Sequence, residues 1–252
     1  MIRFENVVKK LGGKAVLDGV SFEVAKGEVL AVAGPSGTGK SVMLKHIVGL
    51  LSPTSGKVTV DGIEVSSASS RELSAVRDRV GYLFQGGALL GWLTVLENVE
   101  LPLLERTRLG AGEIRRRSMD ALAAVELSDA ADKYPSELSG GMLKRAGLAR
   151  AIVRESGIIL YDEPTSGLDP VTALTINKLV RRVNTRYGAT SVVVTHDLAQ
   201  ALSFADRIML LKGGKVRALL PPREFAASDD PDVREFLEAQ SISAFAGRNK
   251  EA

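Results

Sequence analysis

Short apolar runs recur along the chain and alternate with stretches of helical periodicity. Three of these runs are uninterrupted, at residues 29–33, 158–161 and 192–194. Continuous apolar runs of this length are typical of strands that are buried on both faces of a parallel sheet. Because strand signals and helix signals alternate, the pattern predicts an α/β fold with a mostly parallel sheet.

Between about residues 91 and 156 the pattern changes and is almost entirely helical. The segments with helical spacing are residues 96–106, 112–125 and 139–155. Pro135 breaks the pattern between the last two of them. A helical block between two sheet-forming regions predicts an inserted helical subdomain, which we place at about residues 88–156.

Shorter elements flank this block. Helical spacing or an apolar run predicts helices at 40–49 and 71–79 and a strand at 80–85. Asp61-Gly62 predicts a hairpin turn between residues 57–62 and 63–65, and Gly213-Gly214 predicts a second turn near the end of the sheet. Residues 231–240 are expected to form an amphipathic helix with Val233, Phe236 and Leu237 on one face.

The composition limits the classes of protein to which the chain can belong. A chain of 252 residues can bury one sizeable core, or a core and a smaller lobe. Its net charge of +3, from 33 basic and 30 acidic residues, is too balanced to predict a nucleic-acid partner. The absence of cysteine excludes disulfides, thiol catalysis and cysteine metal sites.

The sequence also bears on membranes. No apolar run reaches the roughly 18 residues that a membrane span needs, and residues 1–5 lack the apolar stretch of a secretory signal. We therefore expect a chain that is soluble by itself and whose membrane role, if it has one, comes through a partner.

One glycine-rich loop carries the clearest chemistry. It matches the pattern G-x-x-x-x-G-K-[ST] with Gly34, Pro35, Ser36, Gly37, Thr38, Gly39, Lys40 and Ser41. Backbone N–H groups in such a loop surround phosphates, and the following helix N-terminus adds partial positive charge. Lys40 is expected to reach the β- and γ-phosphates, and the Ser41 hydroxyl to bind Mg²⁺. The flanking strand and helix signals argue against a chance match.

Four further residues follow predicted strands, where α/β sheets place their ligands. Asp162 is expected to bind Mg²⁺, and Glu163 to act as the general base on the attacking water. His196 lies where it could contact a γ-phosphate, and Gln85 where its amide could contact Mg²⁺ or the water. For an isolated histidine or glutamine a structural role is the more common one, and we assign none to His46.

A second phosphate cradle follows the helical block. Ser139 is a good N-cap for a helix, and Gly140 and Gly141 come directly after it. An ordinary capped helix is the alternative, but two glycines in a first turn cost stability, and close approach of a phosphate would account for them. Because one nucleotide does not need two cradles, the second cradle suggests the nucleotide of another copy.

Six segments, in this order, resemble the nucleotide-binding subunits of ABC transporters. They are residues 34–41 (Walker A), Gln85 (Q-loop), 138–142 (signature), 159–163 (Walker B), 166–169 (D-loop) and His196 (H-loop). The resemblance covers about residues 1–220 and implies a P-loop NTPase fold. That fold has a RecA-like core, an antiparallel β subdomain and the inserted helical subdomain.

The resemblance further implies ATP and Mg²⁺ as cofactors and a head-to-tail homodimer that energises an integral-membrane permease. Residues 34–41 and Val42 would hold the ATP of their own chain, whereas Ser139, Gly140 and Gly141 would complete the site of the partner. Asp169 would cross the interface between the two chains. The metal would be held by Ser41, Gln85 and Asp162.

A finer likeness points to the branch that handles lipids. Residues 34–45, 83–90 and 135–142, with Met142 where most of the family has glutamine, resemble the Mla and Mce-type phospholipid transport ATPases. This implies an MCE-domain substrate-binding protein and a small accessory subunit as partners, at the cytoplasmic face of the bacterial inner membrane. Residues 230–237 resemble the C-terminal extension of that branch, which we place at residues 221–252.

Two features stay open. The family usually stacks adenine on an aromatic residue, but that position is Leu11 here, with Val16 as its apolar neighbour. Selectivity for the base is therefore in doubt, whereas the phosphate chemistry is not. The segment 86–99, with Trp92, could form the groove for a permease or the core of the helical subdomain.

Three alternative functions are compatible with parts of this pattern. An ATPase of another import or export system would share every catalytic residue. A DNA-maintenance or translation ATPase fits less well, because the former separates its motifs by long coiled coils and the latter carries two heads in one chain. A catalytically dead subunit is disfavoured by the presence of Lys40, Asp162, Glu163 and His196.

Overall fold

The computed structural model describes residues 1–240. The chain forms two compact units, each of which is described by itself. The first unit contains Met1–Val76 and the chain from Val192 onward, and the second unit contains Arg77–Ser191. The strand β8 (Thr190–Thr195) passes from the second unit into the first.

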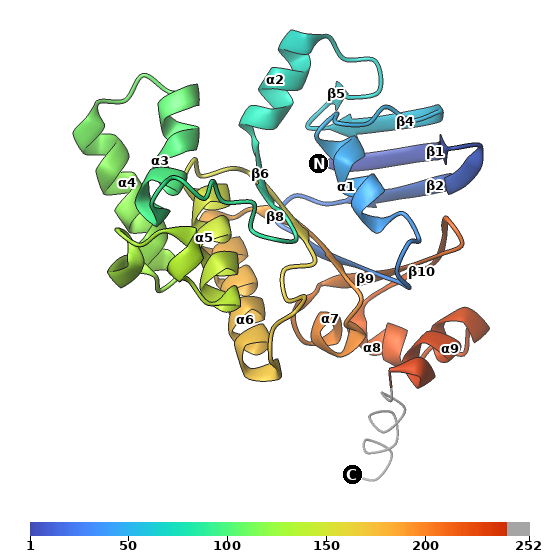
Figure 1. Cartoon of the computed structure of the whole chain (residues 1–252). Coiled ribbons are helices and arrows are strands. Elements are labelled where there is room, and N and C mark those ends of the chain that lie inside the picture. Colours follow the sequence, from blue (N-terminus) through green and yellow to red (C-terminus); the bar gives the residue numbers. More distant parts are fainter. Residues whose placement is uncertain (241–252) are drawn as a thin grey trace. The chain divides into compact units, whose positions relative to one another are not determined.

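An antiparallel sheet in the first unit has the order β2-β1-β4-β5. Its strands are β1 (Ile2–Leu11), β2 (Lys14–Val24), β4 (Ser55–Val60) and β5 (Ile63–Glu64) (Figure 1). The turn at Asp61 and Gly62 is confirmed, with positive φ at both residues. The sequence analysis missed β1 and β2, because register shifts within their pairing disturb the alternation of buried and exposed positions.

The first unit also contains β3 (Val29–Ala33), β9 (Arg207–Lys212) and β10 (Lys215–Leu220). β3 pairs in parallel with β9, and β9 forms an antiparallel hairpin with β10, so the predicted turn at Gly213-Gly214 is confirmed. All five residues of β3 are buried, as its apolar run predicted.

Four helices complete this unit, and their bounds are α1 (Lys40–Ile47), α7 (Leu198–Phe204), α8 (Pro222–Ala226) and α9 (Pro231–Ala239). The sequence extended α1 to residue 49, but the helix ends earlier, and Gly49 has a φ of 63°. In α9, Val233 and Leu237 are buried and Phe236 is half-buried, which confirms the amphipathic helix.

The second unit contains a parallel strand pair and the helices that the sequence predicted. β6 (Val80–Leu83) pairs with β7 (Ile158–Asp162). The helices α3 (Val95–Arg106), α4 (Ala111–Ala124) and α5 (Gly140–Ile152) pack on one another around apolar residues such as Leu103 and Leu122 (Figure 1). The short 3-10 helices η1 (Ser128–Ala130) and η2 (Pro135–Glu137) lie between α4 and α5, and α2 (Ser70–Asp78) leads from the first unit into the second.

The longest helix of the described chain, α6 (Pro170–Tyr187), was missed by the sequence analysis. Its signals are strong: Asp169 caps its first turn, Pro170 occupies the first position, and Gly188 ends it with a left-handed backbone. Ala173, Ile176, Val180 and Val183 recur at helical spacing and are buried.

The sequence left two roles open for the segment 86–99, a groove for a permease and the core of the helical subdomain. The residues of the segment differ in this respect. Val95, Leu96 and Val99 are buried and belong to the core of the second unit. Trp92, in contrast, is 74% exposed and cannot serve as a core residue. A core role is therefore confirmed for the helical part of this segment only.

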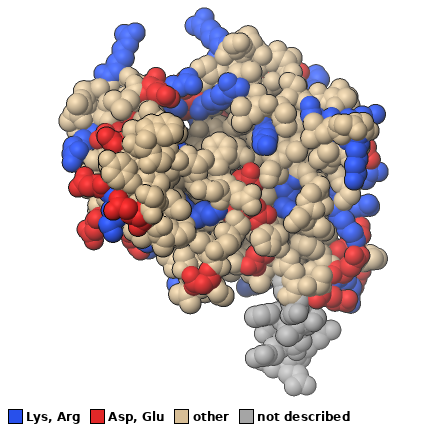
Figure 2. All heavy atoms as spheres, viewed as in Figure 1, with Lys and Arg blue, Asp and Glu red and all other residues tan. Residues whose placement is uncertain are grey.

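Among residues 1–240, no helix is both long and apolar enough to traverse a bilayer. On the face shown in Figure 2, basic and acidic side chains are interspersed among other residues. The predicted boundaries at residues 88, 156 and 220 stay predictions, and residues 241–252 of the proposed extension lie outside the described part of the chain.

Candidate functional site

The glycine-rich loop connects β3 to α1, the context that its motif requires. Lys40 is the first residue of α1 and is only 6% exposed. Its Nζ donates hydrogen bonds to the carbonyl oxygens of Gly34 (2.7 Å) and Pro35 (2.9 Å). Thr38 also donates to the Pro35 carbonyl, at 2.9 Å. The loop is thus closed around a buried ammonium group, which suits it to bind a phosphate.

Gly39 has a φ of 97° and packs against β2. A Cβ at this position would lie 2.8 Å from the carbonyl oxygen of Val16 and 2.9 Å from a methyl of Leu17, so only glycine fits. The predicted neighbour Val16 is therefore in contact with the loop. Leu11 lies at the end of β1, with 44% of its surface exposed, and contact of either residue with a base stays a prediction.

His196 follows β8 in the first unit and is exposed. Around it the backbone is well ordered by hydrogen bonds: Asp197 N donates to Thr195 Oγ1 at 3.0 Å, and Asp197 Oδ1 accepts from Gln200 N at 2.9 Å. Asp197 is thereby the N-cap of α7. The structure thus presents the imidazole to solvent from a fixed turn.

The carboxylates lie in the second unit, at the end of β7. Asp162 is 7% exposed and accepts a hydrogen bond of 3.2 Å from the Tyr82 hydroxyl. Burial, together with the negative charge of Asp162, raises the pKa of Tyr82, so this phenol stays protonated and donates. Tyr82 itself stacks on Phe84, with ring centroids 4.1 Å apart. Tyr82 was not predicted as a site residue. A tyrosine within a short strand carries no sequence signal for a hydrogen bond to Asp162.

Glu163 has a φ of 50°, a left-handed conformation that is unusual for a residue other than glycine, asparagine or aspartate. Such conformations cluster at functional sites, where surrounding contacts hold them. Here the Glu163 carbonyl oxygen accepts hydrogen bonds from Lys144 Nζ (3.2 Å) and from Ser166 Oγ (3.1 Å). Its backbone is therefore held from two sides.

Lys144 is a second residue that sequence reasoning missed. It belongs to α5, is 5% exposed, and also approaches Ser166 Oγ at 3.4 Å. Burial lowers the pKa of Lys144, and the charges of Glu163 and Asp162 oppose that shift. The ammonium group thus connects the helix that follows Ser139 to the loop that carries the predicted base. The sequence signal that could have identified Lys144 is a lysine within an otherwise largely apolar helix.

Gln85 is exposed and lies directly after β6 and Phe84. The loop beyond it has positive φ at Gly87 and Ala88, and Arg150 of α5 donates to both of their carbonyl oxygens at 2.8 Å. Burial lowers the pKa of the Arg150 guanidinium. The structure therefore fixes the loop behind Gln85 and leaves its amide accessible.

Ser139 is the N-cap of α5, and its Oγ accepts from Met142 N at 3.3 Å. The two glycines after it differ in their surroundings. A Cβ on Gly141 would lie 2.5 Å from the Thr172 methyl, so packing against α6 already favours a glycine there. A Cβ on Gly140 would meet only ordinary contact with Leu168. Packing therefore does not account for Gly140, and close approach of a phosphate to it stays a prediction.

Asp169 is exposed and is the N-cap of α6, accepting from Val171 N and Thr172 N at 3.0 Å each. Hydrogen bonds from Thr172 lower the pKa of its carboxyl. The cap gives Asp169 a structural role within its own chain. Its predicted position at an interface between chains stays a prediction.

The predicted residues are thus distributed over both units. The glycine-rich loop and His196 belong to the first unit, whereas Gln85, Ser139, Asp162, Glu163 and Asp169 belong to the second. Hydroxyl, amide and carboxylate oxygens are ligands that Mg²⁺ accepts. Ser41, Gln85 and Asp162 offer these groups, and the buried, hydrogen-bonded carboxylate of Asp162 fits a cation.

Comparison with known proteins gives a consistent result. A family model described as "ABC transporter" matches residues 17–166. The "Intermembrane phospholipid transport system ATP-binding protein MlaF" of Haemophilus influenzae is 40% identical over 241 residues, which cover 96% of this chain and 91% of that protein. The Escherichia coli K12 protein of the same name is 41% identical over 90% of this chain and 84% of its own length.

Other similar proteins carry different names. The "Probable ribonucleotide transport ATP-binding protein mkl" of Mycobacterium tuberculosis H37Rv is 41% identical over 96% of this chain and 67% of that protein. Among solved structures, the dimeric ATP-binding cassette MJ0796 bound to ADP and Pi has a TM-score of 0.82 and 39% identity. The match covers 88% of this chain and 99% of that one.

The loop between β3 and α1, the carboxylates at the end of β7 and the capped, glycine-rich start of α5 are three of the six features on which the sequence resemblance rests. The family model covers more than half of the chain, and the relatives extend the match to nearly all of it. The chain therefore belongs to the ABC transporter family, whose ATP-binding subunits hydrolyse ATP.

Proposed function

We propose that the chain hydrolyses ATP with the residues that the sequence singled out. The observation that carries this proposal is the closed loop around Lys40, together with the strained backbone of Glu163 after a buried carboxylate. Lys40 would bind the β- and γ-phosphates, and the loop N–H groups of residues 34–42 would surround them. Leu11 and Val16 would contact the base.

The metal proposal follows from the donor set. Ser41, Gln85 and Asp162 would hold Mg²⁺, which neutralises charge that develops on the phosphates. Tyr82 would orient the Asp162 carboxylate, because its protonated hydroxyl donates to Oδ2.

Glu163 would accept a proton from the attacking water. Contacts of Lys144 and Ser166 with its carbonyl oxygen fix the backbone from which the carboxylate extends. His196 would contact the γ-phosphate, and Gln85 would position the water or the metal. Because these roles position groups and stabilise charge, the geometry of the backbone matters as much as the identity of the side chains.

We further propose a head-to-tail homodimer. Ser139, Gly140 and Gly141 would complete the nucleotide site of the partner chain, and Asp169 would lie at the interface. The exposed position of Ser139 and Gly140 supports this role, as does the dimeric state of the similar cassette MJ0796.

The transported molecule is proposed to be a phospholipid. Support comes from the relatives named MlaF, which this chain matches over 84% to 91% of their length. The partners would be an integral-membrane permease, an MCE-domain protein and a small accessory subunit, at the cytoplasmic face of the bacterial inner membrane. The exposed Trp92 would contact the permease.

Purification of the whole complex tests the lipid proposal. The tagged full chain is isolated from membranes in mild detergent, and co-purifying proteins and lipids are identified by mass spectrometry. An MCE-domain protein and bound phospholipid are expected. A permease with a nucleotide- or amino-acid-binding protein instead would overturn the lipid proposal and leave the ATPase proposal intact.

A matched pair of variants tests the permease contact. Trp92→Ser should lose the permease from the purified complex while ATP binding is kept. Leu50→Ser is the control, because Leu50 is also exposed, at 54%. It belongs to the first unit, whereas Trp92 belongs to the second. Equal retention of the permease by both variants would contradict a contact at Trp92.

A further inference from the structure

The side chain of Gln240 bridges two backbone groups of the turn that carries His196. Gln240 is the C-cap of α9. Its Oε1 accepts a hydrogen bond from Leu198 N at 2.8 Å, and its Nε2 donates to the carbonyl oxygen of His196 at 2.5 Å. Because an N–H only donates and a carbonyl only accepts, this pair of contacts fixes the orientation of the amide.

The helix that supplies Gln240 is firmly attached to the first unit. Val233 is fully buried, and Asp230 caps the first turn of α9 by accepting from the backbone N–H of Val233 at 3.2 Å. Lys212, at the end of β9, forms ion pairs with Asp232 (2.8 Å) and Glu235 (2.7 Å). The amide of Gln240 therefore extends from a helix that is itself held to the strands.

Gln240 supplies hydrogen-bond partners to two backbone groups of the turn, the N–H of Leu198 and the carbonyl of His196. Leu198 is the first residue of α7, and first-turn N–H groups have no partner within their own helix. Asp197 caps Gln200 N, two residues further along, rather than Leu198 N. The His196 ring is exposed and extends from this turn, so the position of its backbone determines where the ring starts.

We propose that Gln240 is a positioning residue for His196, so that α9 sets the geometry of the imidazole that contacts the γ-phosphate. This inference rests on the proposed role of His196. It assigns to α9 a function in ATP hydrolysis within its own chain, in addition to any function in assembly. Gln240 would not touch the nucleotide itself.

The proposal predicts a specific kinetic effect. Loss of one or two backbone hydrogen bonds allows the turn to sample other conformations, while the glycine-rich loop is untouched. The rate of hydrolysis should therefore fall by about tenfold, as expected for the loss of roughly 1.4 kcal/mol of positioning. The affinity for ATP should stay within about twofold, because His196 contributes to the reaction more than to binding.

Two substitutions of the same residue separate the two contacts. Gln240→Ala removes both, whereas Gln240→Glu is nearly isosteric, keeps the acceptor for Leu198 N and loses the donor to the His196 carbonyl. Glu238→Gln is the control, since Glu238 is exposed on the same helix. His196→Ala is measured alongside, and all variants are prepared as the full chain.

Three quantities are measured: the single-turnover rate, the dissociation constant for ATP and the hydrogen exchange of the Leu198 amide. Gln240→Ala should exchange Leu198 faster and hydrolyse more slowly. Gln240→Glu should keep the exchange protection and still hydrolyse more slowly. Glu238→Gln should match the unsubstituted chain in all three quantities.

Two results would overturn the proposal, and they are distinguishable. If Leu198 exchanges faster in Gln240→Ala while the rate of hydrolysis is unchanged, Gln240 is a structural cap and has no positioning role. If His196→Ala hydrolyses ATP at the normal rate, the proposed role of His196 itself fails, whatever Gln240 does.

Discussion

Glu163 combines an unfavourable backbone conformation with the proposed role of general base. Its φ of 50° persists because hydrogen bonds from Lys144 and Ser166 hold its carbonyl oxygen. A left-handed residue at this point turns the chain sharply after β7, so the carboxylate follows the buried Asp162 without continuing the strand. Strain of this kind is tolerated where surrounding contacts over-determine it.

Substitution of the predicted base tests its role. Glu163→Gln keeps the size and the backbone of the residue but removes the proton acceptor. Hydrolysis should fall by about 10²- to 10⁴-fold, as is usual for loss of a general base, while ATP binding is retained. Single-turnover kinetics and equilibrium ATP binding measure the two effects.

Glu105→Gln is the matched control, because Glu105 is exposed on α3 and the change in charge is the same. Turnover by Glu163→Gln at the rate of this control would remove Glu163 as the base. The buried Asp162 would then be the carboxylate to test next.

At the scale of elements, a buried amide in the second unit holds the start of α3. Asn98 of α3 is fully buried, and its side chain makes hydrogen bonds to the backbone of Leu90, Leu93 and Thr94. These contacts hold the segment that contains the exposed Trp92 against the first turn of α3. The segment therefore has a defined structure although its tryptophan faces solvent.

Removal of this amide should destabilise the second unit. Asn98→Ala leaves the part-buried N–H of Leu90 without its partner at 2.7 Å. The free energy of unfolding should fall by about 1–3 kcal/mol, the usual cost of an unsatisfied buried group. Urea denaturation of this variant and of the exposed Glu105→Ala measures the difference, and equal stability of the two would contradict the role of Asn98.

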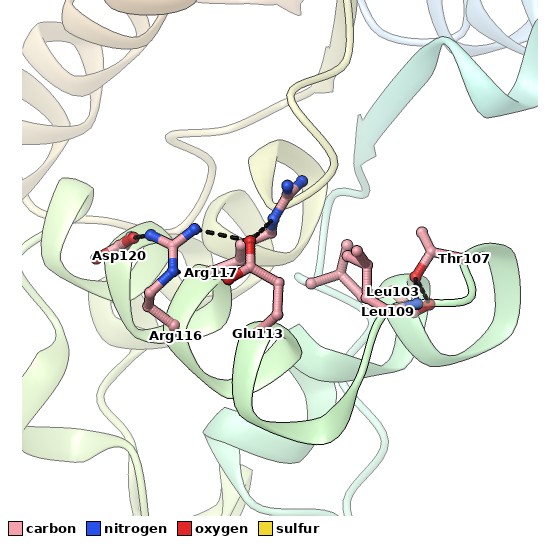
Figure 3. Close-up of polar contacts among 7 residues, drawn as sticks. All are labelled: Leu103, Thr107, Leu109, Glu113, Arg116, Arg117 and Asp120. Carbon is pink, nitrogen blue, oxygen red and sulfur yellow. Dashed lines mark hydrogen bonds and ion pairs between the residues drawn. The ribbon is translucent and has the colours of Figure 1, made fainter.

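The surface of α4 carries a second element-scale feature (Figure 3). Glu113 accepts hydrogen bonds from Arg116 at 2.8 Å and from Arg117 at 2.7 Å, and Arg116 also pairs with Asp120 at 2.8 Å. These arginines lower the pKa of the Glu113 carboxyl from 4.5 to about 2. In the same view, Thr107 donates to the Leu103 carbonyl at the end of α3.

The pH dependence follows from the direction of this shift. Because the pKa of Glu113 is lower in the folded chain, its contribution to stability is present above the ordinary value and is lost as the pH falls through about 2. Titration of the carboxyl carbon by NMR measures the pKa directly. Arg117→Gln should raise it, and added salt should raise it too, because the side chains are exposed. A titration at the ordinary value would contradict the ion pairs.

At the scale of the whole molecule, the proposed dimer makes each nucleotide site from two chains. Ser139→Arg would place a bulky charge in the partner's site, and Lys40→Ala would disable the chain's own phosphate loop. Each variant alone should be inactive, because every site in its homodimer contains one defect.

Mixing these two inactive variants should restore hydrolysis. One site of each mixed dimer combines the intact Lys40 of one chain with the intact Ser139 of the other. Random pairing therefore predicts up to about a quarter of the unsubstituted rate. If two-tag purification shows mixed dimers and no activity returns, the shared site is wrong.

Much of the fold and the site could be predicted because the signals are local. The buried strands β3 and β7 are continuous apolar runs, and residues 34–41 form their loop from neighbours in sequence. The helix α6 was predictable from its cap, its proline and its apolar spacing. β1 and β2 were not, since register shifts disturb their alternation.

By itself, then, the sequence determined the order of the motifs, the α/β fold and the family, because short stretches of neighbouring residues encode each of these. The tertiary structure alone decided that Lys144 holds the carbonyl of Glu163, that Thr172 packs closely against Gly141, and that Gln240 reaches the turn of His196. These contacts join residues distant in sequence, and no local pattern encodes which distant partners meet when the chain packs.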